Sequence, residues 1–192
     1  MHQADDTAID ASTVTGKLAA ARRAMWSREL AAARGHVEAA IGQARTSTER
    51  AEVQRVGKLL ETLDAFWSAV RETLGRLESG HELQLGEATV TVVRASGETL
   101  TVRAAGRNST YGIKDLPQGL AVALAERSLP KDRPAADLAV GSFLAIDLHG
   151  DRHNAQTRWE RAGTDGKALL PELALAPPVE PGEFEEPARF EP

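Results

Sequence analysis

The chain has 192 residues, enough for one full domain or two small ones, and its 42% hydrophobic content is typical of a globular protein with a core. It contains no cysteine, which excludes disulfides, thiolate nucleophiles and zinc held by cysteine. The formal net charge is -5 at pH 7 and most of it falls in residues 177–192. The remainder is nearly neutral and carries no basic block that would follow a phosphate backbone.

Residues 1–14 are polar and without pattern, so we predict a flexible arm there. They lack the basic segment followed by an apolar run that marks a secretory signal. No stretch approaches the roughly 18 apolar residues of a membrane helix. We therefore expect no membrane span and favour the cytoplasm.

Residues 15–79 are predicted to form a helical hairpin. Residues 15–44 are mostly strong helix formers with apolar side chains at heptad spacing. Thr46 and Glu49 have capping-box spacing, so a second helix should begin there and run to about Leu77. Its apolar residues alternate three and four apart and form one seam: Val53, Val56, Leu60, Leu63, Trp67, Val70, Leu74 and Leu77.

Such a seam needs a partner surface. The favoured arrangement is an antiparallel hairpin in which residues 15–44 cover the seam. The alternative is a single bent helix that pairs with a second copy of the chain, which would make a homo-oligomer. As protein-interaction residues of the seam we predict Trp26, Leu30, Leu63 and Trp67, because tryptophan and leucine at seam positions are apolar anchors.

Residues 81–116 change to a period of two, which predicts a small antiparallel sheet. Strands are expected around residues 83–85, 89–92, 99–102 and 111–113. Four short strands cannot bury both faces alone, so the sheet should curl into a small SH3-like barrel or pack against helices.

Residues 117–176 are predicted to be a C-terminal helical region. Helices are expected from Leu116 to Leu129, from Ala135 to Leu148 and from Asp151 to Ala162, with a short one near Leu169. Residues 177–192 are acidic and rich in proline, and are predicted to be a disordered tail. Phe184 and Phe190 repeat an aromatic-acid-proline theme there and could dock as a short peptide, or the tail could only aid solubility.

Two resemblances accompany this pattern. Ala155, Trp159 and Ala162, preceded by Gly141 and Leu144, resemble one degenerate tetratricopeptide (TPR) helix pair, in which small residues let neighbouring helices nest. A longer stretch is similar to a C-terminal module of bacterial, planctomycete-type proteins, through residues 66–70, 90–93, 105–111 and 115–121. That family has no assigned activity, so the resemblance implies architecture and no site residues.

One cluster of side chains could hold a metal ion: Asp147, His149, Asp151 and His153. Two imidazoles and two carboxylates suit zinc or a similar divalent ion, and would make a metal-dependent enzyme. The other interpretation is a polar loop between helices in which Asp151 caps the second helix. Ligands from one short loop rarely close a site without a distant group, so we expect no metal or other cofactor.

Arginine and lysine side chains near Tyr111 give an alternative function, binding of single-stranded nucleic acid by the small barrel. The cations are Arg94, Arg103, Arg107 and Lys114. Neighbouring carboxylates cancel their charge, and one tyrosine is a poor stacking platform. Nucleic acid is therefore not the expected partner.

The sequence thus predicts an α+β protein made of a helical hairpin, a small antiparallel sheet and a C-terminal helical region. It contains no Gly-x-Ser-x-Gly or Walker-type loop. We assign no catalytic residue and predict a non-catalytic adaptor or scaffold module with protein partners.

Overall fold

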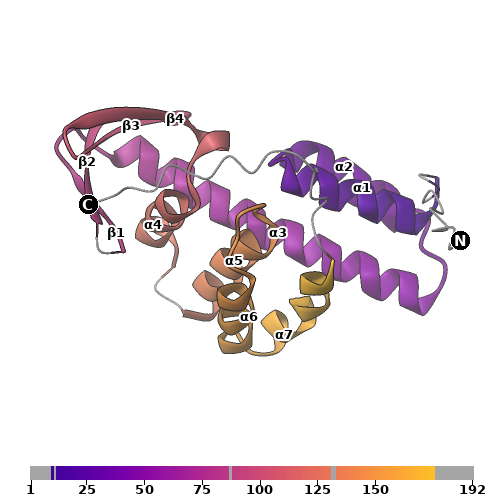
Figure 1. The fold of residues 1–192 in the computed structure, drawn as a ribbon. Helices are drawn as coiled ribbons and strands as arrows, with labels where there is room; N and C mark the ends of the chain where they lie inside the picture. Colours follow the sequence, from indigo (N-terminus) through magenta and orange to yellow (C-terminus); the bar gives the residue numbers. More distant parts are fainter. Residues whose placement is uncertain (1–9, 11, 87, 131–132, 176–192) are drawn as a thin grey trace, which may run out of the picture.

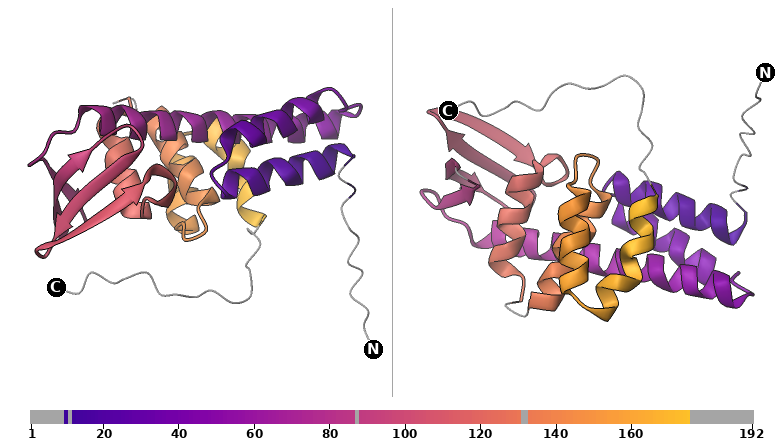
Figure 2. Two further views of the ribbon diagram at one scale, coloured as in Figure 1. Left: turned by 90° about the horizontal axis from the view of Figure 1, so that it is seen from above. Right: turned by 60° about the horizontal axis from the view of Figure 1, so that its bottom comes forward.

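The computed structural model describes residues 10, 12–86, 88–130 and 133–175. They form an α+β structure with a four-stranded antiparallel sheet, as predicted. Helix α3 (Ser47–Arg76) runs along the length of the molecule, with the sheet at its C-terminal end and α1 and α2 beside its N-terminal half (Figure 1). The C-terminal helices line one side of α3 (Figure 2). No helix of this described part is long and apolar enough to cross a bilayer.

The prediction of one helix over residues 15–44 is wrong, because the structure has two helices in this region. Helix α1 (Val14–Trp26) ends at Ser27, and α2 (Leu30–Ile41) folds back against α1. The break is a Schellman motif, in which the N–H of Arg28 donates to Met25 O (3.0 Å) and the N–H of Glu29 to Ala24 O (2.8 Å). Arg28 has a φ of 56°, the left-handed conformation that usually belongs to glycine.

Helix α3 begins as predicted, with a capping box between Thr46 and Glu49. Its seam is covered within the chain, because α1, α2 and α5 pack against it. Leu63 is only 1% exposed and Trp67 4%. The helices of the same chain therefore take the place of the second copy in the alternative arrangement.

The sheet is an open meander of order β1-β2-β3-β4: β1 (Glu82–Leu85), β2 (Ala88–Ala95), β3 (Thr99–Ala104) and β4 (Arg107–Gly112). One face joins the helical core through Val90, Val92, Leu100 and Val102. The opposite face carries mostly threonine and charged side chains. Ile113, predicted to be in the last strand, instead begins the 3-10 helix η1 (Ile113–Asp115).

The C-terminal helices are α4 (Gln118–Ser128), α5 (Arg133–Ile146), α6 (Arg152–Arg161) and α7 (Thr164–Leu169), followed by the 3-10 helix η2 (Leu170–Ala174). Helix α6 packs closely on α5 at Gly141. A Cβ atom there would lie 2.7 Å from Cδ1 of Trp159, so glycine is required for this approach.

A buried ion-pair network ties η2 to α1 and α3. The carboxylate of Glu172, whose side chain is 2% exposed, accepts from Arg22 Nε (2.8 Å) and Arg55 Nε (2.7 Å). Arg22 also pairs with Glu52 (3.2 Å). Burial alone would raise the pKa of Glu172, but the hydrogen bonds and charges of Arg22 and Arg55 outweigh burial, so its pKa is lowered.

This lowered pKa predicts acid sensitivity. A carboxylate with a depressed folded-state pKa stabilises the fold fully above its ordinary pKa and loses that contribution as the pH falls through the folded-state value. We expect a stable melting temperature down to about pH 5 and a fall below about pH 4. As the pH falls over the same range, the difference in unfolding free energy between wild type and Glu172→Gln should become smaller. A difference that stays constant to the acid unfolding limit, measured by urea denaturation, would contradict this assignment.

Candidate functional site, a cleft around Arg28

Two adjoining hollows meet where the helical hairpin, the sheet and the C-terminal helices come together, and we name them jointly the Arg28 cleft. The first has a volume of about 430 Å³ and lies between the start of α2, the middle of α3, the β2–β3 turn and η1. The second, of about 620 Å³, lies between the α1–α2 turn, η1 and the α5–α6 loop. Arg28 and Lys114 line both hollows.

The Arg28 side chain joins all three parts of the chain. Its guanidinium donates to the carbonyls of Lys114 and Leu116 and pairs with the Asp147 carboxylate at 2.6 Å. It also lies 5.0 Å from the centroid of the Trp67 ring, within cation–π range. Because one side chain holds η1, the α5–α6 loop and α3, it fixes the relative position of the cleft walls.

The backbone of Arg28 adopts a strained conformation, and the contacts of its side chain hold it there. A non-glycine residue in the left-handed conformation costs roughly 1–2 kcal/mol. Glycine would relieve that strain but could not reach Asp147, whose side chain is 5% exposed. Non-glycine residues in this conformation concentrate at binding and catalytic sites, where the surrounding contacts hold them in place.

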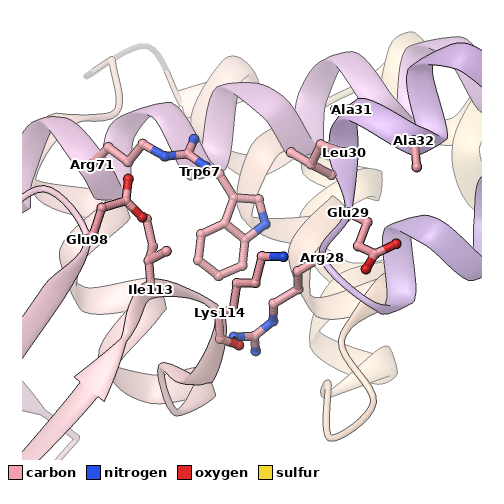
Figure 3. A pocket seen from close by; sticks show the side chains of 10 residues that line it. All are labelled: Arg28, Glu29, Leu30, Ala31, Ala32, Trp67, Arg71, Glu98, Ile113 and Lys114. Carbon is pink, nitrogen blue, oxygen red and sulfur yellow. Dashed lines mark hydrogen bonds between the residues drawn. The ribbon is translucent and has the colours of Figure 1, made fainter.

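The first hollow has an apolar wall with balanced charge around it. Trp67, Leu30 and Ile113 form the wall, and Figure 3 shows Lys114 extending beneath the Trp67 ring. The other charged groups are Arg71, Glu29 and Glu98. Within the described residues, Arg71 and Lys114 form no ion pair, so these two cations and two carboxylates remain open to solvent.

The second hollow is the more apolar surface of the two. Trp26 is half-buried at its edge, and Leu116 and Pro117, which connect η1 to α4, line it as well. Leu148 also lines it and is 58% exposed. Together with the half-buried Trp26 it adds exposed apolar area to this hollow.

No protein family, curated protein or solved structure matches this chain. The cleft therefore has to be interpreted from its own residues. It offers apolar walls and balanced charge.

Three of the four predicted seam residues border this cleft, although Trp67 is only 4% exposed there. Trp26 lines the second hollow, and Leu30 and Trp67 line the first. Leu63 lies instead in the core and cannot contact a partner from the folded chain, because α3 and its neighbours enclose it. The predicted docking residues Phe184 and Phe190 lie outside the described residues.

The four residues considered as metal candidates, Asp147, His149, Asp151 and His153, do not converge. The described residues contain no group of three or more His, Asp or Glu side chains arranged to hold a metal ion. Asp147 is paired with Arg28, and Asp151 caps α6 by accepting from Asn154 N–H at 2.9 Å. His149 lines the second hollow, and His153 is exposed on α6. The loop interpretation accounts for both carboxylates.

Arg103 and Tyr111, two of the residues considered for nucleic-acid binding, lie on opposite faces of the sheet. Arg103 pairs in register with Asn108 on the outer face and donates to its side chain at 2.9 Å. Tyr111 lies opposite Leu100, which is fully buried, so Tyr111 belongs to the inner face. Side chains on opposite faces cannot form one stacking and basic surface, so Arg103 cannot act together with Tyr111. Of the arginines, Arg107 shares the Tyr111 face, because it lies opposite Ala104.

Arg28 is the residue that sequence reasoning missed. It sits in an apparent run of helix formers, and no glycine or proline marks the break after Trp26. The one local signal is Ser27, a residue that competes with helical hydrogen bonding. A single serine is too common to identify a helix end.

Proposed function

We propose that this chain is a non-catalytic protein-interaction module and that the Arg28 cleft is its binding surface. The observation that supports the proposal is the position of Trp26, Leu30 and Trp67, three predicted anchor residues, around one cleft with the exposed Leu148 at its edge. A few residues contribute most of the binding energy in protein interfaces, and tryptophan is enriched among them.

The charge of the cleft favours an uncharged protein segment as its ligand. Arg28 is neutralised by Asp147, and the open cations Arg71 and Lys114 are matched by Glu29 and Glu98, so the cleft has an excess of one negative charge, from Asp115 in the second hollow. A strongly acidic or basic ligand would gain little from such a surface. Two hollows side by side suit an extended segment with more than one apolar side chain better than one compact small molecule.

The resemblances suggested by the sequence are hypotheses that agree with this proposal. An SH3-like sheet and a TPR-like α5–α6 pair would both belong to folds that commonly bind peptides. The similarity to a module of planctomycete-type proteins adds no activity. A cytoplasmic location and an additional interaction through residues 177–192 also remain proposals.

A cavity-filling substitution tests the function. Random peptides displayed on phage are selected against the immobilised full-length chain, and the most enriched peptide is labelled for affinity measurement. Ala32 is exposed and lines the first hollow, so Ala32→Trp should fill the hollow and weaken binding about tenfold, or 1.4 kcal/mol. Ala39→Trp on the same helix is exposed and outside the cleft, and should leave affinity unchanged.

Circular dichroism and melting temperature check that both variants fold like the wild type. The proposal would be wrong if no peptide is enriched. It would also be wrong if Ala32→Trp and Ala39→Trp bind the enriched peptide equally well.

A further inference from the structure

Within the part of the chain that the structure describes, strand β4 is an open edge of the sheet, and it leads into the Arg28 cleft. It pairs with β3 along all six of its residues and otherwise contacts chiefly η1 (Figure 1). The other edge strand, β1, packs against α4. From Gly112 the chain continues directly to Ile113 and Lys114, which line the first hollow (Figure 3).

The hydrogen-bond alternation shows which β4 groups face outward. The N–H of Ile113 donates to Glu98 O at 2.9 Å, which places residue 113 in a hydrogen-bonded pair. In an antiparallel ladder such pairs alternate with pairs whose backbone groups point away from the neighbour. The N–H and C=O groups that point away from β3 therefore belong to Asn108, Thr110 and Gly112.

Side-chain contacts agree with this assignment. Opposite side chains are closer in the pairs that lack backbone hydrogen bonds. The hydroxyls of Thr101 and Thr110 lie 2.8 Å apart, and Arg103 donates to Asn108 at 2.9 Å. Both contacts fall on pairs assigned as outward-facing.

The edge also lacks the devices that usually block strand addition. Edge strands are commonly protected by proline, lysine or a bulge. Residues 107–112 contain neither proline nor lysine, and the one register shift of the sheet lies between Val92 and Arg94, in β2. The single charge of β4 is Arg107, at the end far from the cleft.

We propose that β4 accepts an extended, uncharged segment of a protein partner as an antiparallel fifth strand, with a bulky apolar side chain of that segment entering the first hollow beside Trp67. This inference rests on the proposed function, because it states how the same cleft receives its partner. Antiparallel addition continues the pattern of the sheet, in which every neighbouring pair is antiparallel. Main-chain hydrogen bonds supply affinity in strand addition, and the pocket supplies specificity.

A pair of substitutions at one position tests the strand addition. Thr110→Pro and Thr110→Ala both remove the hydroxyl contact with Thr101, but only proline also removes the outward N–H. Proline is tolerated on an edge strand because that N–H is not part of the ladder. In the full-length chain, we expect Thr110→Ala to bind the enriched peptide within about twofold of wild type, and Thr110→Pro to bind it about tenfold more weakly.

Amide hydrogen exchange on the wild-type chain gives a test that does not depend on the proline variant folding. On saturation with the peptide, the amides of Asn108, Thr110 and Gly112 should exchange more slowly. Unchanged exchange at all three would overturn strand addition. If Ala32→Trp abolishes binding while Thr110→Pro binds like wild type, the strand addition is wrong but the interaction function stands. If no peptide binds at all, both are wrong.

Discussion

Glu172→Gln is expected to lower the free energy of unfolding by about 3–5 kcal/mol, because it leaves two arginine side chains beside a buried neutral amide. The Arg22 side chain is itself almost fully buried and would keep only Glu52 as a counter-charge. In a chain of this size, each kcal/mol shifts the melting temperature by about 2–4 °C. The melting temperature should therefore fall by about 10 °C.

Urea denaturation at neutral pH measures this loss. The matched control is Glu72→Gln, which breaks an exposed i,i+4 pair between Glu72 and Arg76 on α3. Exposed pairs contribute about 0–1 kcal/mol, so the control should remain close to wild type. Equal effects of the two substitutions would show that the Glu172 network does not fasten η2 to α1 and α3.

Arg28→Ala is expected to destabilise the chain by a similar 3–5 kcal/mol, because Asp147 would remain buried without its counter-charge. Arg28→Gly removes the same contacts but relieves the left-handed backbone, for which alanine has a penalty of roughly 1–2 kcal/mol. Glycine has its own cost in chain entropy of up to about 1 kcal/mol. The glycine variant should therefore be the more stable of the two by a fraction of a kcal/mol to about 1 kcal/mol.

The order of stability of these variants separates the effect of the Arg28 side-chain contacts from the effect of its left-handed backbone. Urea denaturation should give wild type, then Arg28→Gly, then Arg28→Ala in decreasing stability. Arg71→Ala is the control, because Arg71 lines the same hollow and forms no ion pair with any described residue. An Arg28→Ala variant as stable as Arg71→Ala would contradict the role of the Arg28 contacts in holding the cleft together.

Local signals predicted most of the secondary structure. The capping box at Thr46 and the cap at Asp151 begin the helices that the structure shows there. The alternation of apolar residues placed the strands within a few residues of their observed bounds. These features depend on neighbours in sequence, which the sequence displays directly.

The cleft could not be predicted because its contacts connect distant positions. Arg28 and Asp147 are 119 residues apart, and only the fold shows that they meet. For the same reason the sequence suggests Asp147 as a candidate metal ligand beside nearby histidines, and gives no sign of its pairing with Arg28. The spacing of Trp26, Leu30 and Trp67 predicts apolar anchors, but spacing does not reveal which other elements surround them.

The most direct test of the Arg28 cleft as a peptide-binding surface is a two-dimensional NMR titration of the full-length chain with the enriched peptide. The chain has three tryptophans, so each indole N–H gives its own signal. The signals of Trp67 and Trp26 should shift together with the backbone amides of β4, while that of Trp159, fully buried between α5 and α6, should not. Shifts confined to other surfaces, or no shifts at saturating peptide, would contradict the account.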